Sequence, residues 1–228
     1  PNVPDHPDLR TGAVYGTGKR EENLRGYFAA ISAMDEQIGR LLDAVEEQGL
    51  ADNTVILFTA DNGMSMGQHG VWGKGNGTFP MNMYDSAVKV PFLISWPGHI
   101  PANTVCSEMI SACDLLPTIL KLTGLSDKQP TGLPGRSFTE LLEGRQLDHR
   151  DEVVNFDEYG PVRMIRTKEW KYVHRYPYGK HELYHLVDDP GEEKNLYGLP
   201  EYKKLVTQLK GRMEKWFCTY SDPAIDGV

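Results

Sequence analysis

Residues 55–74 read VILFTADNGMSMGQHGVWGK, and this stretch decides the fold that the sequence predicts. It begins with a short apolar run, Val55 to Phe58, which is typical of a strand buried on both faces in a helix-covered sheet. Asp61 and Asn62 follow where that strand should end. Because ligands of open α/β sheets usually bind beyond the ends of the strands, we expect a ligand site at these two oxygen-bearing side chains.

Glycine dominates the residues that follow this strand. Six glycines between positions 63 and 77 make a helix or a regular strand costly, so we expect an irregular loop that carries His69 and Lys74. An aspartate beside a neutral amide oxygen, with a lysine a dozen residues further on, suits a hard cation next to a bound oxyanion.

The composition of the 228 residues is that of a globular protein, with 39% hydrophobic and 25% charged residues and no apolar run long enough to span a bilayer. A net charge of −8 without clustered Lys and Arg argues against a nucleic-acid-binding surface. The three cysteines allow at most one disulfide, so the compartment stays undecided. The sequence opens PNVPDHPDLR, in which a targeting peptide cannot be judged.

The first 150 residues alternate helical and strand patterns, which indicates an α/β fold. After a loop over residues 1–20, apolar spacing predicts a long amphipathic helix from Asn23 to near Gly49. Residues 90–96 predict a second buried strand, and residues 105–110 a short one. We expect Asp114 to cap a helix through Leu122, and a capping box of Ser137 and Glu140 to start another.

Beyond Arg150 the pattern changes to short strands separated by turn residues. A helix over residues 201–217 should pack across the resulting antiparallel sheet. The sequence therefore predicts a small α+β subdomain whose strands are Val153–Phe156, Val162–Arg166, Lys171–Tyr176 and Glu182–Leu186.

Taken in order, several segments resemble the second half of a sulfatase, a member of the alkaline-phosphatase-like superfamily. The order and spacing of the segments make this resemblance specific. They are YFAAISAMDEQIGRLLDAVEEQG (27–49), ILFTADNG (56–63), GQHGVWGKG (67–75), VPFLISWPG (90–98), DLLPTIL (114–120), RMIRTKEWKYVHRY (163–176) and ELYHLVDDPGEEKNL (182–196).

The resemblance implies a partial alkaline-phosphatase-like α/β/α sandwich over residues 1–150, with the site loop at 55–78, followed by the α+β subdomain at 151–228. It implies that Asp61 and Asn62 bind a divalent cation and that Lys74 contacts sulfate. For His69, contact with substrate and a loop-holding role both stay open. Arg163, Arg166, His174 and Arg175 are candidates for contact with the rest of the substrate.

An Asp–Asn pair without an adjacent His or Cys fits Ca²⁺ better than Zn²⁺, with another divalent cation as the alternative. Relatives that handle phosphate through transition metals tend to carry histidine at the second position. Asn62 therefore favours sulfate.

The family nucleophile is a formylglycine formed from Cys or Ser in a Cys/Ser-x-Pro-x-Arg motif, and Cys106, Cys113 and Cys218 all lie in other settings. We expect that motif upstream, and this chain to be inactive alone. The expected substrate is a sulfated small molecule or carbohydrate, in a periplasmic or secreted enzyme. A phosphoryl-ester hydrolase of the same superfamily and a non-catalytic sulfatase-like chain are the alternatives. Sheet edges left uncovered should promote self-association.

Overall fold

The computed structural model describes residues 10–11, 20–145, 150–157, 159–177, 180–222 and 224. The chain divides into two compact units, residues 1–103 and 104–228, and each is described by itself. Most of the loop expected over residues 1–20 lies outside the described residues. The predicted change of domain after residue 150 stays a prediction.

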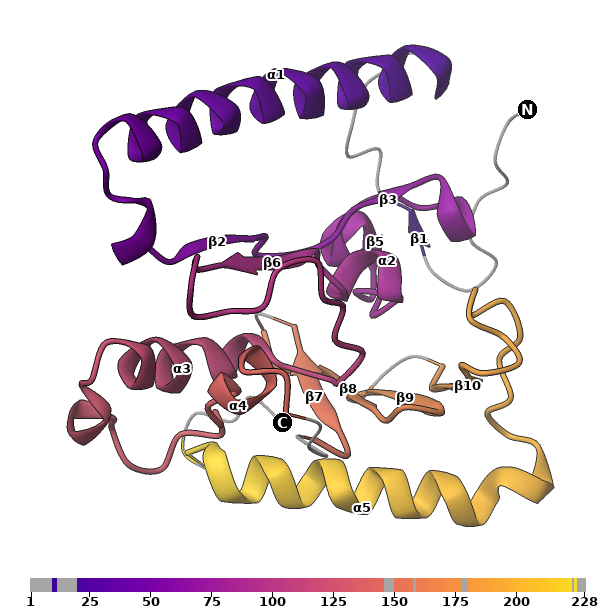
Figure 1. Cartoon of the computed structure of the whole chain (residues 1–228). Coiled ribbons are helices and arrows are strands. Elements are labelled where there is room, and N and C mark those ends of the chain that lie inside the picture. The colour runs from indigo at the N-terminus through magenta and orange to yellow at the C-terminus, as the bar shows by residue number, and fades with distance from the viewer. Residues whose placement is uncertain are drawn as a thin grey trace. The chain divides into compact units, whose positions relative to one another are not determined.

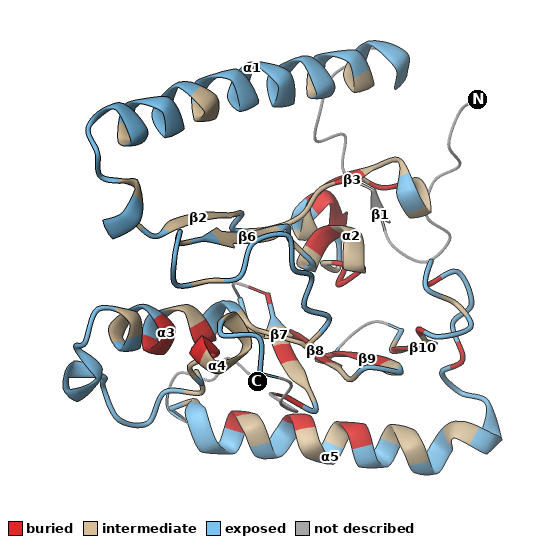
Figure 2. Cartoon of the chain, in the orientation of Figure 1, coloured by how far each residue is buried: buried red, intermediate tan, exposed pale blue. Residues whose placement is uncertain are grey.

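The predicted long helix of the first unit forms as α1 (Arg20–Glu47). Gly49 ends it in the left-handed region at φ 65°, and the N–H of Leu50 closes the last turn onto the carbonyl of Val45. None of its residues is buried, as the pale blue and tan helix in Figure 2 shows. Within the described residues the apolar face of α1 is therefore covered only in part, with Leu24, Tyr27 and Val45 half-buried.

The strand that opens the site is β2 (Ile56–Thr59), which pairs antiparallel with β6 (Phe92–Ser95). Figure 1 shows this two-stranded sheet near α2 (Asp85–Val88). The residues of β2 are only half-buried. The strand was predicted correctly, but the expected burial on both faces is wrong for this chain, because a two-stranded sheet leaves both strands at an edge.

The glycine-rich loop is irregular, as predicted. Its elements are only two or three residues long, and β4 pairs with β3 while β5 pairs with β1. They are β3 (Ser65–Met66), η2 (Gln68–Gly70), β4 (Trp72–Gly73), η3 (Gly75–Gly77) and β5 (Thr78–Phe79), with β1 at Arg10–Thr11.

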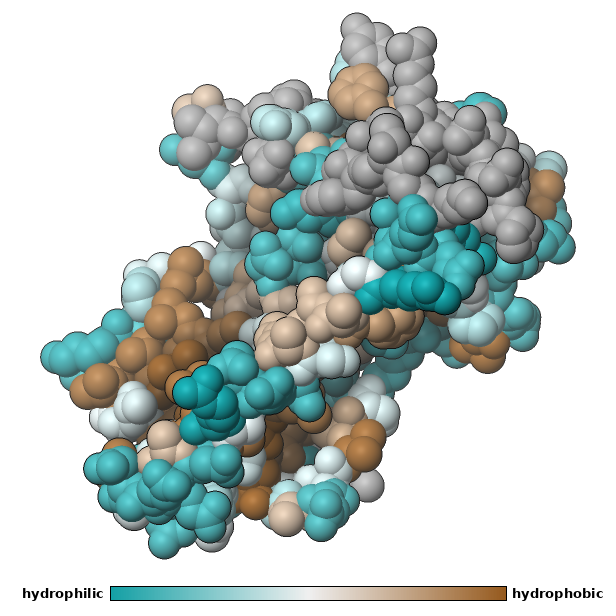
Figure 3. Space-filling view, turned by 90° about the horizontal axis from the view of Figure 1, so that it is seen from above, coloured by the Kyte–Doolittle hydropathy of each residue, from teal (hydrophilic) through white to brown (hydrophobic). Residues whose placement is uncertain are grey.

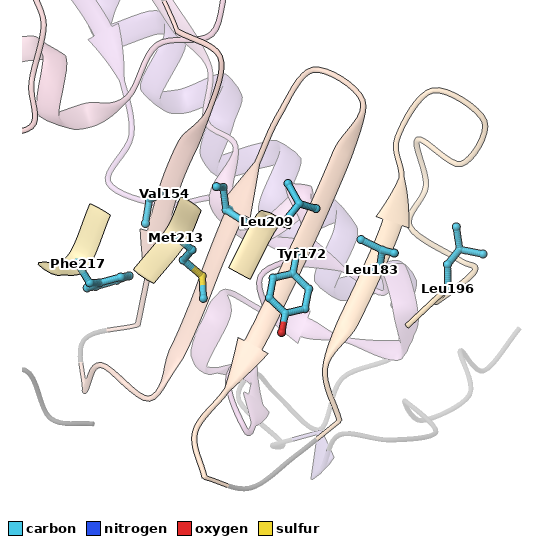
Figure 4. Close-up of a cluster of buried hydrophobic side chains, with 8 residues drawn as sticks. Val154, Tyr172, Leu183, Leu196, Leu209, Met213 and Phe217 are labelled. Carbon is cyan, nitrogen blue, oxygen red and sulfur yellow. The ribbon is translucent and has the colours of Figure 1, made fainter. Parts of the chain in front are cut away.

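The second unit contains a four-stranded antiparallel sheet in the order β10-β9-β8-β7, with α5 packed on it. Figure 4 shows Leu209, Met213 and Phe217 of α5 facing Tyr172 and Leu183 of the sheet. The predicted subdomain and its helix are thus confirmed. Its elements are β7 (Val153–Phe156), β8 (Val162–Arg166), β9 (Trp170–Arg175), β10 (Glu182–His185) and α5 (Lys203–Tyr220).

Three local expectations in this unit are wrong. No strand forms at residues 105–110, where Glu108 instead contacts Lys168. The helix α3 (Leu115–Leu122) follows the 3₁₀ turn η4 (Ala112–Asp114), and the side chain of Asp114 closes a capping box with Ser111 on that turn and makes no cap to α3 itself. The carboxylate of Asp114 is fully buried against Arg150 and the backbone N–H groups of Ser111 and Arg136.

The third concerns α4 (Thr139–Leu142), which forms without the predicted capping box. Ser137 accepts a hydrogen bond from the N–H of Thr139, one residue too early for that box, and Glu140 pairs with Lys121. The remaining short turns of the chain are η1 (Ala51–Asn53), η5 (Ser126–Lys128) and η6 (Pro200–Tyr202).

Candidate active site

Asp61 and Asn62 lie just after β2, where the sequence placed a ligand site. Asp61 is exposed, and its Oδ1 accepts a hydrogen bond of 2.8 Å from the N–H of Asn62. Asn62 is half-buried, and its Nδ2 donates to the carbonyl of Gly63 at 3.0 Å. That bond uses the donor end of the amide, and it leaves the acceptor, Oδ1, for another group.

Lys74 reaches this acceptor from the far side of the glycine-rich loop. Its Nζ donates to Asn62 Oδ1 at 3.0 Å, which joins residues twelve positions apart. Lys74 follows β4, whose Gly73 pairs with Ser65 of β3, so the short hairpin carries the lysine back towards the end of β2. The structure therefore brings together three of the four residues that the sequence singled out.

Gly63 fixes the turn that carries Asp61 and Asn62. Its N–H donates to the carbonyl of Ala87 at 2.9 Å, and a Cβ at this position would lie 2.2 Å from the carbonyl oxygen of Ser86. The side chains of Ser65 and Ser86 are also hydrogen-bonded, at 2.7 Å. The site turn is thus held against α2 at a distance that only glycine allows.

His69 is held by a ring contact in the same loop. Its backbone is left-handed, with φ 55°, and its ring stacks on the buried Tyr84 with the centroids 3.7 Å apart. This stack supports a loop-holding role for His69. Contact with a substrate stays a prediction.

Asn82, which the sequence reasoning missed, follows the loop in sequence, bonds to it and is fully buried. Its Nδ2 lies within hydrogen-bond distance of the carbonyls of Lys74 and Gly75 and of Thr78 Oγ1. The signal that could have found it is a single amide in the apolar run Met81-Asn82-Met83-Tyr84, since a polar group among core residues needs internal partners.

The residues present fit part of a site for a hard cation. An exposed carboxylate at Asp61 and an amide oxygen at Asn62 are calcium-type donors, and no His or Cys accompanies them in this turn. Two side chains are few for a cation that takes six to eight oxygens. Within the described residues, no group of three or more His, Cys, Asp or Glu could hold a metal ion.

The two arginines and the histidine singled out in the closing hairpins have structural partners. Arg175 is buried in an ion pair with Glu182 at 2.9 Å, and Arg163 lies 3.7 Å over the ring of Phe217. His174 accepts or donates a 2.6 Å hydrogen bond at Nδ1 with Tyr172 Oη. These contacts support packing roles for the three residues in place of substrate contact.

Two family models match the chain. The model described as "Sulfatase" matches residues 1–125, and the model described as "N-sulphoglucosamine sulphohydrolase, C-terminal" matches residues 67–218. The chain belongs to the sulfatase family.

Curated sulfatases align with nearly the whole of this sulfatase chain. It is 32% identical to an ulvan-active sulfatase of Formosa agariphila over 90% of the chain and 40% of that relative. It is 31% identical to an N-acetylglucosamine-6-O-sulfatase of Bacteroides thetaiotaomicron over 94% of the chain and 39% of that relative. The chain therefore spans about two-fifths of the length of the relatives it matches.

Solved structures confirm the partial alkaline-phosphatase-like fold. A protein solved with its substrate D-glucosamine-2-N,6-O-disulfate superposes with a TM-score of 0.80 at 30% identity, over 94% of this chain and 45% of that one. A phosphonate monoester hydrolase of Agrobacterium radiobacter superposes with a TM-score of 0.71 at 27% identity, over 85% and 41%. The fold is thus shared with a protein that takes a sulfated sugar as substrate and with a phosphonate monoester hydrolase.

Proposed function

We propose that this chain is the C-terminal part of a longer sulfatase that hydrolyses a sulfate ester, and that the loop at 55–78 binds the sulfate group. The observation that carries the proposal is the 3.0 Å contact between Lys74 Nζ and Asn62 Oδ1. It brings a cation and a metal-type oxygen donor to one point at the end of β2. Membership of the sulfatase family supports the reaction class.

Lys74 would act on charge that develops at the sulfate. Attack at sulfur moves negative charge onto the non-bridging and leaving oxygens, so an ammonium fixed beside them stabilises the transition state more than the ground state. Asn62 Oδ1 holds Nζ in place before the substrate arrives through one of its two lone pairs, and the other stays available to a cation. Such preorganisation means that the lysine need not be reoriented during the reaction.

Asp61 and Asn62 would hold the divalent cation, for which we propose Ca²⁺ on the chemistry of their oxygens. A bound cation would add positive charge beside the sulfate. The nucleophile is proposed to be a formylglycine encoded upstream, since Cys106, Cys113 and Cys218 are outside the motif that yields it.

A sulfated carbohydrate is the substrate class that we propose. It is supported by relatives named for ulvan and N-acetylglucosamine sulfate and by the neighbour solved with a disulfated glucosamine. A periplasmic or secreted location is proposed with it. No described helix is both long and apolar enough to cross a membrane.

The test is to express the protein with its upstream coding region and to measure turnover of a sulfated sugar and of a matched phosphonate monoester. The proposal predicts a Cys/Ser-x-Pro-x-Arg motif upstream and faster turnover of the sulfate ester. Faster turnover of the phosphonate would favour the class of the Agrobacterium neighbour. Loss of both activities, with the motif absent, would leave a non-catalytic sulfatase-like chain.

Calcium binding gives a separate test on the chain itself. Because Asp61 and Asn62 supply only two of roughly six to eight oxygens, titration calorimetry should find weak binding here and tight binding in the longer protein. Asp61→Ala should abolish the tight binding. Tight binding by the chain alone that survives Asp61→Ala would show that the metal assignment is wrong.

A further inference from the structure

Asn82 bonds to the backbone carbonyls of Lys74, the candidate sulfate-binding lysine, and of the next residue, Gly75. Its Nδ2 lies 3.3 Å from the carbonyl oxygen of Lys74 and 3.1 Å from that of Gly75. Its own N–H donates to the same Gly75 carbonyl at 3.1 Å. These two acceptors determine which end of the amide faces them. If Oδ1 took the position of Nδ2, the carbonyl oxygens would repel it.

The backbone before Lys74 is fixed as well. Gly73 belongs to the β3–β4 hairpin, and the N–H of Gly77 closes η3 onto the Lys74 carbonyl at 2.8 Å. Lys74 is therefore held at three places. The hairpin fixes the backbone on its N-terminal side, η3 fixes it on the C-terminal side, and Asn62 bonds to its Nζ. Among the described residues, Asn82 is the only side chain that the structure shows bonding to the carbonyls of both Lys74 and Gly75.

The burial of Asn82 indicates why an asparagine occupies this position. The residue is fully buried, and its Oδ1 has no hydrogen-bond partner among the described residues. An unpaired buried acceptor lowers stability, so a residue retained for packing alone would be better apolar. The donor side of the amide, which touches the Lys74 peptide, gives the reason for an asparagine here.

We propose that Asn82 is a positioning residue, which fixes the Lys74–Gly75 backbone so that the ammonium of Lys74 meets the sulfate at the correct distance. The inference rests on the proposed function, since it assigns Lys74 to sulfate. Asn82 itself does not touch the substrate in this account. Its effect on turnover therefore passes through Lys74 alone.

A double-mutant cycle tests this dependence in the longer protein. Asn82→Ala should lower kcat on the order of 10²-fold, as displacements of about 1 Å do, with a smaller change in KM. In the Lys74→Ala background it should lower kcat no further, because the group that it positions is gone. An equal fold-loss in both backgrounds would overturn the inference.

Thr78→Val is the matched control. It removes one partner of the Asn82 Nδ2 and the bond from Thr78 Oγ1 to the Pro80 carbonyl, but keeps both bonds to the lysine loop. It should lower thermal stability with little change in kcat. If Asn82→Ala does not fold, Asn82→Ser takes its place, since serine is too short to reach both carbonyls.

A measurement that does not depend on turnover separates the positioning role of Asn82 from the assignment of Lys74 to sulfate. Acylation of Lys74 by an amine-reactive reagent, followed by mass spectrometry of this chain, should become faster in Asn82→Ala relative to the exposed Lys89. An unchanged ratio would overturn the inference even if Lys74 proves essential. A raised ratio with full turnover by Lys74→Ala would instead uphold the positioning and refute the sulfate assignment.

Discussion

At the scale of single residues, Gly63 shows how closely the site turn is packed. A methyl group there would lie 2.2 Å from the carbonyl oxygen of Ser86 and 3.1 Å from that of Lys89, both of them backbone atoms. Ser86 lies in α2 and Lys89 directly follows that helix, so a shift of these carbonyls would displace α2 or its C-terminal end. The turn that presents Asp61 and Asn62 is therefore coupled to the position of α2.

Gly63→Ala should destabilise the first unit by about 1–3 kcal/mol, the usual cost of overpacking, and weaken calcium binding in the longer protein. Gly26→Ala in α1 is the control, because nothing lies within 4 Å of its added methyl group. That control should be neutral or stabilising by about 0.5–1 kcal/mol. Equal thermal transitions for the two variants would contradict the packing shown for Gly63.

The sequence predicted which residue types form the site but not how they are held. Asp61, Asn62 and Lys74 stand out because oxygen donors and a lysine flank a glycine-rich loop. Asn82 does not stand out, because its partners are backbone carbonyls that any sequence offers. Only the folded loop shows that its amide bonds to the Lys74 and Gly75 peptides.

At the scale of elements, the sheet that α5 packs on carries a stacked histidine pair, in which His174 is buried and His181 is half-buried. His174 of β9 stacks on His181 with the centroids 4.0 Å apart. Burial, followed by the charges of His181, Lys210 and Arg163, lowers the pKa of His174 to about 4. Burial and nearby cations also lower the pKa of His181.

These pKa shifts predict loss of stability in mild acid. In the unfolded chain the pKa of histidine is about 6.5. Below that pH the unfolded state therefore binds more protons than the folded state, in which these pKa values are lower. The free energy of unfolding should fall as the pH drops from about 6.5 towards 4, where His174 itself becomes protonated. Above pH about 7 these two groups contribute no pH dependence.

Urea unfolding at pH about 7 and pH about 5 measures the effect. His174→Gln keeps a hydrogen-bonding group beside Tyr172 but cannot titrate, so its urea midpoint should change less between the two pH values. The exposed His99→Gln serves as the control and should behave as the parent does. The account of this pair fails if His174→Gln keeps the full pH dependence.

Long or repeated patterns predicted elements well, whereas local end signals did not. The helix at α1 and all four strands of the C-terminal sheet were predicted within a few residues of their bounds. Asp114 does not cap α3 with its side chain, because that carboxylate bonds to the N–H of Ser111 and to Arg150, 36 residues away. A pattern in a short window cannot reveal such a distant partner.

At the scale of the whole molecule, much apolar surface stays exposed. Large hydrophobic residues of α1 are among the most exposed, including Phe28 at 60% and Leu41 at 67%. The brown side chains in Figure 3 show apolar groups at the surface of the chain. In relatives more than twice as long, residues outside the matched region are available to cover such a face.

This chain should therefore self-associate when produced alone, because exposed apolar surface drives association. Light scattering should give a mass above 25.6 kDa that rises with concentration. Phe28→Glu with Leu41→Glu should shift the mass towards the monomer. The control, Ala29→Glu with Ala33→Glu, adds the same charge on the side of α1 away from the apolar series and should not. A monodisperse monomer for the parent chain would refute this expectation.

The central claim is that the loop at 55–78 binds sulfate through Lys74, and Lys74→Ala in the longer protein tests it most directly. Removing one electrostatic partner of a transition state costs on the order of 10²–10³ in kcat, so kcat/KM for a sulfate ester should fall by about that factor. Thermal stability should change little, since Lys74 is only half-buried and bonds to one side chain. The exposed Lys89→Ala should retain full activity. Turnover by Lys74→Ala close to that of the parent would show that this loop is not the sulfate site.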